Sequence, residues 1–389
     1  MAFSSPKPKP TQPRRIMAKV LMNHHGGSGS DDCITSIRCN GREFWVDMSP
    51  TFLRHSPVLE SRYREFIAAL EAEFDGEEYE EEVLEDYQEW LIAALEPIFL
   101  ELAPDVLPSF DPEKLATGEA HPLLSEYLFP QEYWCRLETE NDKAYPVYLP
   151  DHRSPFGRPR SNDIPPELEQ ELEQCGVRFF DPAEVEVAFR RPVEALGQEP
   201  TRVLVELDTL GRKTLCFFKT FSFGGEEMLE RELKAHLRVI QSSLAPDARV
   251  ARLHGVVTVD GRIAGMLLTQ IDHGKHTNGP LYEKGLLYVP IPLRQRWAKQ
   301  IRETVEQFHD AGLVWGDAKA ENVMIDRNDD AWLIDLGGGY TEGWVDKDKA
   351  GTKEGDLQGL DRILEHLSNE EYESFSDTDS LGSDSARCA

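Results

Sequence analysis

The sequence predicts an α+β protein of two domains, and three observations support this fold class. Apolar residues that alternate with polar ones predict short strands on both sides of a proline-rich stretch. Apolar residues that recur every three or four positions predict amphipathic helices between these strands. The 389 residues are enough to form two hydrophobic cores, so we expect each domain to fold around its own core.

Composition and charge exclude several classes of function. Hydrophobic residues make up 40% of the chain and charged residues 29%, and the formal net charge is -29 at pH 7. Sequence-independent nucleic-acid binding depends on Lys and Arg that neutralise phosphates, so we expect no nucleic-acid partner. No apolar run approaches the length needed to span a membrane, and the basic N-terminus lacks the apolar core of a secretory signal. We therefore expect an intracellular protein, cytoplasmic or nuclear, without a membrane partner.

The six cysteines favour free thiols in a reducing compartment. They are scattered along the chain and contain no Cys-x-x-Cys pair, so neither a disulfide framework nor a zinc site is predicted. We expect no structural metal.

The N-terminal third predicts a disordered tail followed by a small α+β domain. Residues 1–30 are rich in Pro, Lys, Gly and Ser, which is typical of disorder, and a weak nuclear address is the alternative interpretation of the basic part. Residues 31–150 form the predicted N-terminal domain, of unknown role. Asn40-Gly41 separates two apolar runs and predicts a β-hairpin. Pro57 begins a helical stretch, and the apolar spacing over 84–98 predicts one buried helix face.

An acidic run lies within this domain. Residues 71–89 hold eleven Asp or Glu and no Lys or Arg. The run is typical of a solvated helix face, and a basic partner protein is the alternative. Residues 151–176 then read as a Pro- and Arg-rich linker, and residues 177–367 form the predicted second domain.

The second domain begins with strands and a helix that carry a candidate ion pair. Apolar residues alternate over 185–189, 203–207 and 215–219, which predicts a small antiparallel sheet. Lys219 is the one charged residue of 216–221, and an edge-strand lysine facing water is the alternative interpretation. Glu232 follows on a helix with a buried leucine stripe, where its carboxylate can reach Lys219; Glu227 and Glu230 are alternatives for this role. Asp260-Gly261 predicts a further hairpin over 252–271.

Residues 309–339 contain the densest group of candidate catalytic residues. Two apolar runs, 323–325 and 332–334, flank the turn-forming residues 326–330 and predict a short hairpin. Asp317 and Asn322 precede this hairpin, and Asp335 follows it directly. Folding the hairpin brings two acids and an amide oxygen into one cleft. Oxygen ligands suit Mg²⁺, which relies on phosphates and water for its other ligands, so this cleft predicts a Mg-ATP site beside a substrate hydroxyl.

These motifs resemble the protein kinase superfamily. Asp317-x-Lys319-x-x-Asn322 is similar to its catalytic loop, and Asp335-Leu-Gly337 is similar to its Asp-Phe-Gly motif. The resemblance implies a bilobal fold with a small antiparallel N-lobe sheet plus a helix and an abbreviated helical C-lobe. It implies that Asp317 accepts the substrate proton, that Lys319 stabilises the transferred phosphoryl group, and that Asn322 and Asp335 bind the metal.

The same resemblance assigns the nucleotide-binding residues. Lys219 is implied to contact the ATP phosphates and Glu232 to hold that lysine, as an ion pair of this kind does in the superfamily. Thr269 and Ile271 are implied to lie near the adenine. The implied cofactors are ATP and Mg²⁺. Asp356, in 355–364, is implied to begin a helix and to brace the catalytic-loop backbone. The region over 31–150 loosely resembles the one that precedes the kinase-like domain in many uncharacterised proteins of filamentous fungi, which implies no activity.

The chain departs from the superfamily pattern in several places. No Gly-x-Gly-x-x-Gly stands between the first two strands, where Gly197 is the glycine present, and Trp315-Gly316 replaces the usual His-Arg. The segment over 338–354 is short, and residues 368–389 form an acidic, Ser-rich tail that is expected to be disordered. We expect a protein serine/threonine kinase-like phosphotransferase. A small-molecule kinase of the aminoglycoside or choline phosphotransferase type and a catalytically weak scaffold are the alternatives, and the substrate remains open.

Overall fold

The computed structural model describes residues 18–25, 31–75, 81–152, 161–197, 199–207, 210–221, 225–274, 280–281, 286 and 289–368. It is an α+β structure that divides into two compact units. The first unit comprises residues 1–159 and 183–200, and the second comprises 160–182 and 201–389. Residues 183–200 thus belong to the first unit, although the sequence placed them in the second domain. The expected C-terminal tail lies outside the described residues, apart from Ser368.

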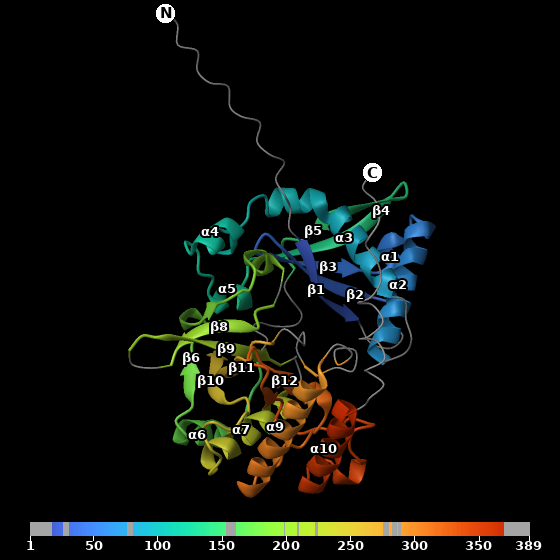
Figure 1. The fold of residues 1–389 in the computed structure, drawn as a ribbon. Helices are drawn as coiled ribbons and strands as arrows, with labels where there is room; N and C mark the ends of the chain where they lie inside the picture. The colour runs from blue at the N-terminus through green and yellow to red at the C-terminus, as the bar shows by residue number, and fades with distance from the viewer. Residues whose placement is uncertain are drawn as a thin grey trace, which may run out of the picture. The chain divides into compact units, whose positions relative to one another are not determined.

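The first unit is built on a five-stranded sheet in the order β1-β2-β3-β4-β5 (Figure 1). Neighbouring strands are antiparallel except β3 and β4, which are parallel and joined by the helices of this unit. The strands are β1 (Ala18–His25), β2 (Cys33–Cys39), β3 (Arg42–Met48), β4 (Glu132–Glu140) and β5 (Lys143–Tyr148).

Helices α2 (Pro57–Asp75) and α3 (Glu81–Leu102) pack on one face of this sheet and close its core. Phe44 of β3 and Phe99 of α3 meet edge to face with ring centroids 4.8 Å apart, and Phe66 of α2 stacks on Tyr87 of α3 at 3.8 Å. Such aromatic pairs add packing energy to the burial of the rings. The helical segments are α1 (Pro50–Leu53), α2 (Pro57–Asp75), α3 (Glu81–Leu102), η1 (Pro108–Phe110), α4 (Pro112–Thr117), α5 (Leu124–Leu128), η2 (Pro182–Glu184) and η3 (Pro192–Leu196).

The predicted hairpin of this unit is confirmed. Asn40 and Gly41 join β2 to β3 with φ angles of 52° and 86°, the left-handed conformation that a two-residue hairpin turn requires. A side chain at Gly41 would also collide with Phe110, because an added Cβ would lie 2.9 Å from its ring. The helical stretch that begins at Pro57 is confirmed as α2.

Several parts of the sequence form structure that was not predicted. Residues 18–25, within the expected N-terminal tail, form β1 and pair with β2. The expected linker contains helix α6 (Pro166–Gln174). The strand expected over 185–189 is reduced to β7 (Glu186–Val187), which follows η2.

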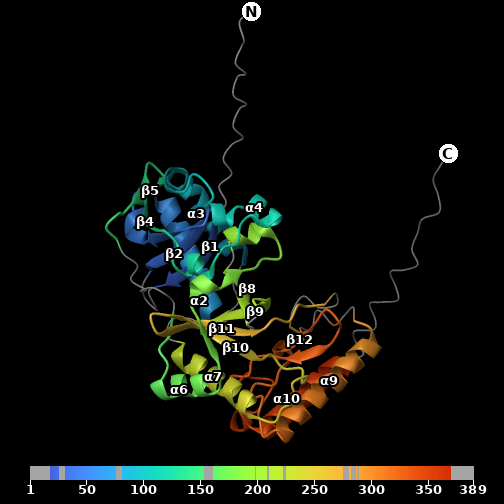
Figure 2. The same cartoon turned by 90° about the vertical axis from the view of Figure 1, so that its left-hand side faces the viewer.

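The second unit contains strands β6, β10, β11, β9 and β8, which are neighbours in this order within one sheet. Figure 2 labels four of them, β8 to β11. Strands β8 to β11 are antiparallel neighbours, whereas β6 runs parallel to β10. The hairpin predicted around Asp260-Gly261 joins β10 to β11. The strands are β6 (Arg178–Phe180), β8 (Arg202–Glu206), β9 (Lys213–Thr220), β10 (Leu253–Val259) and β11 (Arg262–Thr269).

Helices and a second small sheet complete this unit. The predicted hairpin over 323–334 is confirmed as β12 (Val323–Ile325) paired with β13 (Ala331–Leu333). Helices α9 and α10 lie side by side and share a core with this hairpin (Figure 1). The fully buried side chains of Trp297, Trp315 and Phe308 occupy that core. The helical segments are α7 (Glu226–Gln241), α9 (Ile291–Asp310), η4 (Ala320–Asn322), η5 (Lys347–Lys349) and α10 (Lys353–Ser368).

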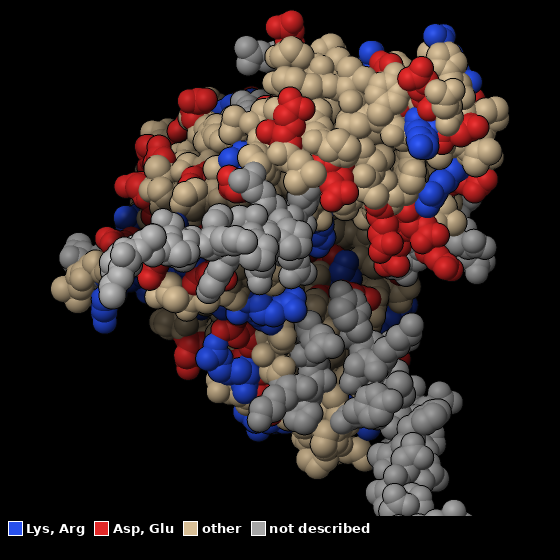
Figure 3. Space-filling view, turned by 90° about the horizontal axis from the view of Figure 1, so that it is seen from above, with Lys and Arg blue, Asp and Glu red and all other residues tan. Residues whose placement is uncertain are grey.

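The surface reflects the acidic composition. Asp and Glu side chains lie in several groups on the face seen from above, with Lys and Arg among them (Figure 3). Within the described residues, no helix has both the length and the apolar character needed to cross a membrane.

Candidate functional site

Three charged residues from distant parts of the chain meet in the second unit. The Nζ atom of Lys219, on β9, lies 2.7 Å from Oε2 and 2.9 Å from Oε1 of Glu232, on α7. The same atom lies 2.8 Å from Oδ1 of Asp335, which follows β13. Glu230, the alternative partner on the same helix, pairs instead with Lys234. The ammonium group therefore joins the sheet, the helix and the hairpin segment.

Burial and charge act in opposite directions on this lysine. Burial disfavours the charged ammonium, but the carboxylates of Glu232 and Asp335 outweigh it, so the pKa of Lys219 lies above its ordinary value. Glu232 has only 4% of its side chain exposed, whereas Asp335 has 45% exposed. The first carboxylate is thus a fixed structural partner of Lys219, and the second faces solvent, where a ligand can reach it.

A second cluster surrounds Asp317. Its Oδ2 accepts hydrogen bonds from Nδ2 of Asn322 at 3.1 Å and lies 3.0 Å from Nζ of Lys319. Its Oδ1 accepts a bond of 3.1 Å from the hydroxyl of Thr341, and Lys319 in turn donates to Thr341 at 2.9 Å. The carboxylate is held by three side chains but retains 13% exposure. The arrangement orients Asp317 and leaves it accessible to a small polar group.

Glycines bring the two clusters close together. Gly337 follows Asp335 and passes Glu232 so closely that an added Cβ would lie 3.2 Å from the glutamate Cβ. An added Cβ at Gly339 would lie 3.4 Å from Oδ2 of Asp317. Asp335 itself has a φ of 58°, in the left-handed region that Asp tolerates better than bulkier residues. The segment over 335–339 therefore needs small residues to thread between α7 and the Asp317 loop.

A buried carboxylate fixes the backbone that precedes Asp317. Asp356, near the start of α10, is 1% exposed and accepts hydrogen bonds of 2.7 Å from the amides of both Trp315 and Gly316. Its Oδ2 also lies 2.9 Å from Nε2 of His309. Helix α10 also packs closely against this loop, because an added Cβ at Gly359 of α10 would lie 2.6 Å from Cβ of Ala318.

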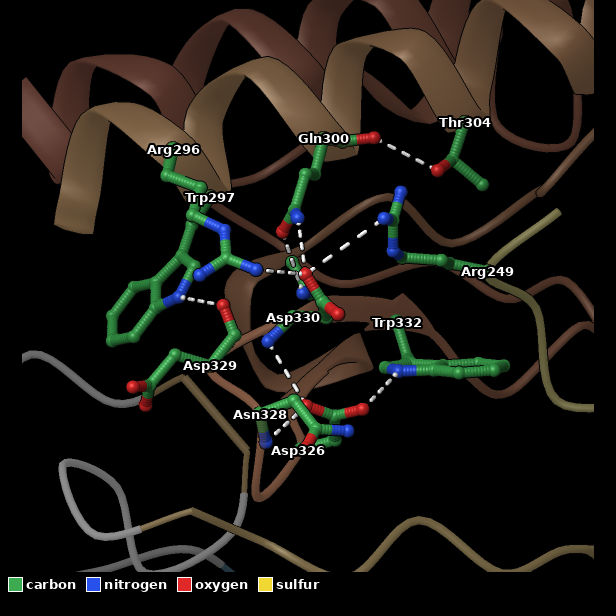
Figure 4. Close-up of polar contacts among 11 residues, drawn as sticks. Arg249, Arg296, Trp297, Gln300, Thr304, Asp326, Asn328, Asp329, Asp330 and Trp332 are labelled. Carbon is green, nitrogen blue, oxygen red and sulfur yellow. Dashed lines mark hydrogen bonds and ion pairs between the residues drawn. The ribbon is translucent and has the colours of Figure 1, made fainter. Parts of the chain in front are cut away.

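The hairpin between Asn322 and Asp335 is anchored to α9 (Figure 4). Asp330 accepts hydrogen bonds from Arg296 and Gln300 of α9. Gln300 also accepts from the amide of Ala331 at 2.9 Å, and Trp297 donates to the carbonyl of Asp329 at 3.0 Å. These bonds fix the hairpin turn and hence the positions of the residues at its two ends.

The residues expected near the adenine lie at the end of β11. Thr269 pairs with Cys216 across the sheet, three residues before Lys219 on β9. Its hydroxyl accepts a 3.0 Å bond from the amide of Arg252, so it serves the strand structure. Ile271 is 6% exposed.

Asn322 and Asp335 are the residues whose side-chain oxygens would hold a magnesium ion together with phosphates. The amide nitrogen of Asn322 donates to the carbonyl and the carboxylate of Asp317, so its oxygen is the atom that remains for a cation. The exposed carboxylate of Asp335, whose Oδ1 lies 2.8 Å from Nζ of Lys219, would offer a second oxygen. Among the residues that the structure describes, no group of three or more His, Cys, Asp or Glu is placed to hold a metal. Mg²⁺ needs no such group when phosphates and waters supply its other ligands.

Three contacts of the site were not predicted from sequence. His309 contacts Asp356, 47 positions away, and Thr341 donates to Asp317, 24 positions away. Gln300 donates to Asp330, 30 positions away. Thr341 lies in a segment without a recognisable motif, and only the folded chain brings it to Asp317. A scan of protein-family models and a search of curated proteins both find no match for this chain.

Proposed function

We propose that the second unit is a bilobal, protein-kinase-like phosphotransferase that uses ATP and Mg²⁺. The observation that carries this proposal is the ammonium of Lys219 held between Glu232 and Asp335, which are 13 and 116 positions away. Gathering these charges has an energetic cost in desolvation. A nucleotide phosphate bound beside Lys219 gives the arrangement a function, because a fixed ammonium next to an exposed carboxylate suits a phosphate with its metal.

Each residue of the two clusters has a role in this proposal. Lys219 binds phosphate oxygens, and Glu232 holds its ammonium in place. Asn322 and Asp335 hold the metal through their side-chain oxygens. When bound, Mg-ATP supplies the phosphoryl group together with the cation that neutralises its charge.

Asp317 is the proton acceptor for the attacking hydroxyl. Its carboxylate is oriented by Asn322 and Thr341 and is partly exposed, so a substrate hydroxyl can reach it. Lys319 lies 3.0 Å from this carboxylate, and in this proposal it stabilises negative charge on the transferred group. A general base of this kind contributes about 10²- to 10⁴-fold to the rate.

The acceptor that we favour is a Ser or Thr hydroxyl of a protein, since Lys319 lies two residues after Asp317 as in protein kinases. A specific observation supports a small-molecule acceptor as the second candidate. Between β13 and α10, the described chain forms only the short η5, so little structure is present there to dock a peptide.

Phosphate transfer from labelled ATP tests this proposal. The full chain is incubated with Mg-ATP and either a peptide library or a panel of small hydroxyl metabolites, and the labelled class identifies the acceptor. Asp317→Asn is expected to lower the rate by about 10²-fold or more. Asp310→Asn, an exposed aspartate at the end of α9, is the matched control and should transfer at the wild-type rate. Equal transfer by wild type and Asp317→Asn would contradict the assigned role.

A further inference from the structure

A groove in the second unit lies beside the proposed phosphotransfer site. None of the residues to which the proposed function gives a role lines this groove. Its volume is about 620 Å³. One wall is α7, and the other walls are formed by 312–316, 336–340 and 350–351. Buried apolar side chains form the floor, among them Val239, Phe308 and Leu336.

The rim of this groove is basic. Arg231, Lys234 and Arg238 lie three and four positions apart on α7, so they share one helix face. All three side chains are exposed, and none of the described residues that line the groove is acidic. Lys234 pairs with Glu230, whereas Arg231 and Arg238 have no ion-pair partner among the residues described. Three bases around an apolar floor are a distinct feature in a chain with 71 acids and 42 bases.

We propose that the acidic C-terminal segment of the same chain, residues 369–389, docks in this groove. The segment contains six acids and one base, which complements the rim. Its sequence Ser376-Asp-Thr-Asp-Ser-Leu-Gly-Ser-Asp-Ser385 places Leu381 between acidic stretches. The acids match the three bases of α7, and the leucine matches the apolar floor.

The segment is long enough to reach. Helix α10 begins next to the groove, at Lys353, and ends at Ser368. Its 16 residues span about 24 Å, which an extended chain covers in roughly seven residues. Returning along the helix therefore brings the stretch from about residue 376 onward to the basic rim. This is the stretch that carries the alternating Ser and Asp residues.

Phosphorylation would strengthen this contact. A phosphoserine or phosphothreonine adds about -1.5 to -2 charges and three acceptor oxygens, which Arg binds well. The segment holds five Ser and one Thr, most of them next to an acid. The docked segment lies against Gly337–Gly339, so it also contacts the backbone that runs between Asp335 and Asp317.

A photo-crosslink from Cys388 tests the docking in the full chain. Four of the other cysteines are buried, and burial raises the pKa of Cys39 and Cys135 to about 12 and that of Cys216 to about 11, which makes these thiols unreactive. Replacing the partly exposed Cys175 by serine leaves Cys388 as the reactive thiol for a benzophenone maleimide. After irradiation, crosslinked peptides are identified by mass spectrometry. We expect them within 231–239, 308–316 and 336–340.

Charge reversal on the rim tests the role of its bases, and charge reversal elsewhere provides the control. Arg231→Glu/Arg238→Glu should lower the yield of these crosslinks about fivefold or more, as expected for the loss of two exposed ion pairs. Lys299→Glu/Arg302→Glu, on an exposed face of α9 away from the groove, changes the net charge equally and should leave the yield unchanged. Salt at about 1 M should also lower the wild-type yield, because it shortens the screening length to about 3 Å.

Two outcomes would overturn the proposal. In the first, crosslinks are spread over other surfaces and their yield is the same in both double variants. This result would show that the segment does not recognise the groove. Crosslinks between two chains would show that it binds a second copy instead. Neither readout needs ATP or turnover, so failure of the proposed phosphotransfer would leave this test unaffected.

Discussion

Replacing Asp356 by alanine should destabilise the loop that carries Asp317. The carboxylate is 1% exposed and accepts bonds from two backbone amides and from the ring of His309. Asp356→Ala leaves these donors buried without their acceptor. A hydrogen bond to a charged group contributes about 1.5–3 kcal/mol, and Asp356 accepts such a bond from each of two buried amides. We therefore expect the free energy of unfolding to fall by about 3–6 kcal/mol, the sum for two such bonds.

Native-state hydrogen exchange measures this effect at the atoms concerned. The amides of Trp315 and Gly316 donate directly to Asp356, so their protection reports the lost bonds. Asp361→Ala is the matched control, because Asp361 lies on the same helix but is exposed. A surface substitution of this kind changes stability by no more than about 0.5 kcal/mol. If both amides were as well protected from exchange in Asp356→Ala as in Asp361→Ala, Asp356 would not hold this loop.

The remaining predictions concern packing, the hairpin and pH. Gly359→Ala should lower the free energy of unfolding by about 1–3 kcal/mol in urea denaturation, because the new methyl group has no space next to Ala318. Asp330→Ala should cost about 1–3 kcal/mol and raise amide exchange in β12 and β13, since Arg296 and Gln300 lose their acceptor; unchanged exchange there would contradict the anchoring role. The pKa of His254 is lowered by burial and by the nearby charges of His236 and Arg252. His254 therefore binds a proton more readily in the unfolded chain than in the folded one. Stability should therefore decline as the pH falls below about 6.5, and His254→Gln should reduce that decline in denaturation curves measured from pH 7 to pH 5.

Local sequence signals predicted much of the fold. Asn40-Gly41 and Asp260-Gly261 each have the positive φ angles that a tight hairpin turn requires, and few other residue pairs adopt them readily. The apolar spacing on α3 and α7 also predicted most of the buried face of each helix, although Ile240, expected in the stripe of α7, is exposed. These signals lie within a few residues of each other, so they can be found without knowledge of the folded chain.

Long-range pairing could not be predicted in the same way. Strand β1 follows a Pro- and Lys-rich stretch and becomes a strand by pairing with β2. Strands β4 and β5 meet at Asn141-Asp142, which have φ angles of 51° and 56°, but mixed aromatic and charged residues obscure their alternation. Residues 183–200 join the first unit through contacts such as the hydrogen bond from Leu124 to Val185. No local pattern indicates these partners.

The candidate site shows the same division. The order and spacing of Asp317, Asn322 and Asp335 predicted that they lie around one hairpin, and this hairpin is present. The sequence left three glutamates of α7 open as partners of Lys219, and the structure pairs it with Glu232. The supporting contacts of Thr341 and His309 depend on the packing of distant segments.

Thermal unfolding with and without Mg-ATP tests the central claim most directly. A ligand present at about 100 times its dissociation constant stabilises the native state by about 2.7 kcal/mol, which raises the midpoint of a domain of this size by roughly 5–10 °C. We predict such a rise for the wild type and for Asp361→Ala, and little or none for Asp335→Ala, which lacks the carboxylate that we propose to bind the metal. An equal rise in all three proteins, or no rise in the wild type at millimolar Mg-ATP, would contradict the proposed nucleotide site.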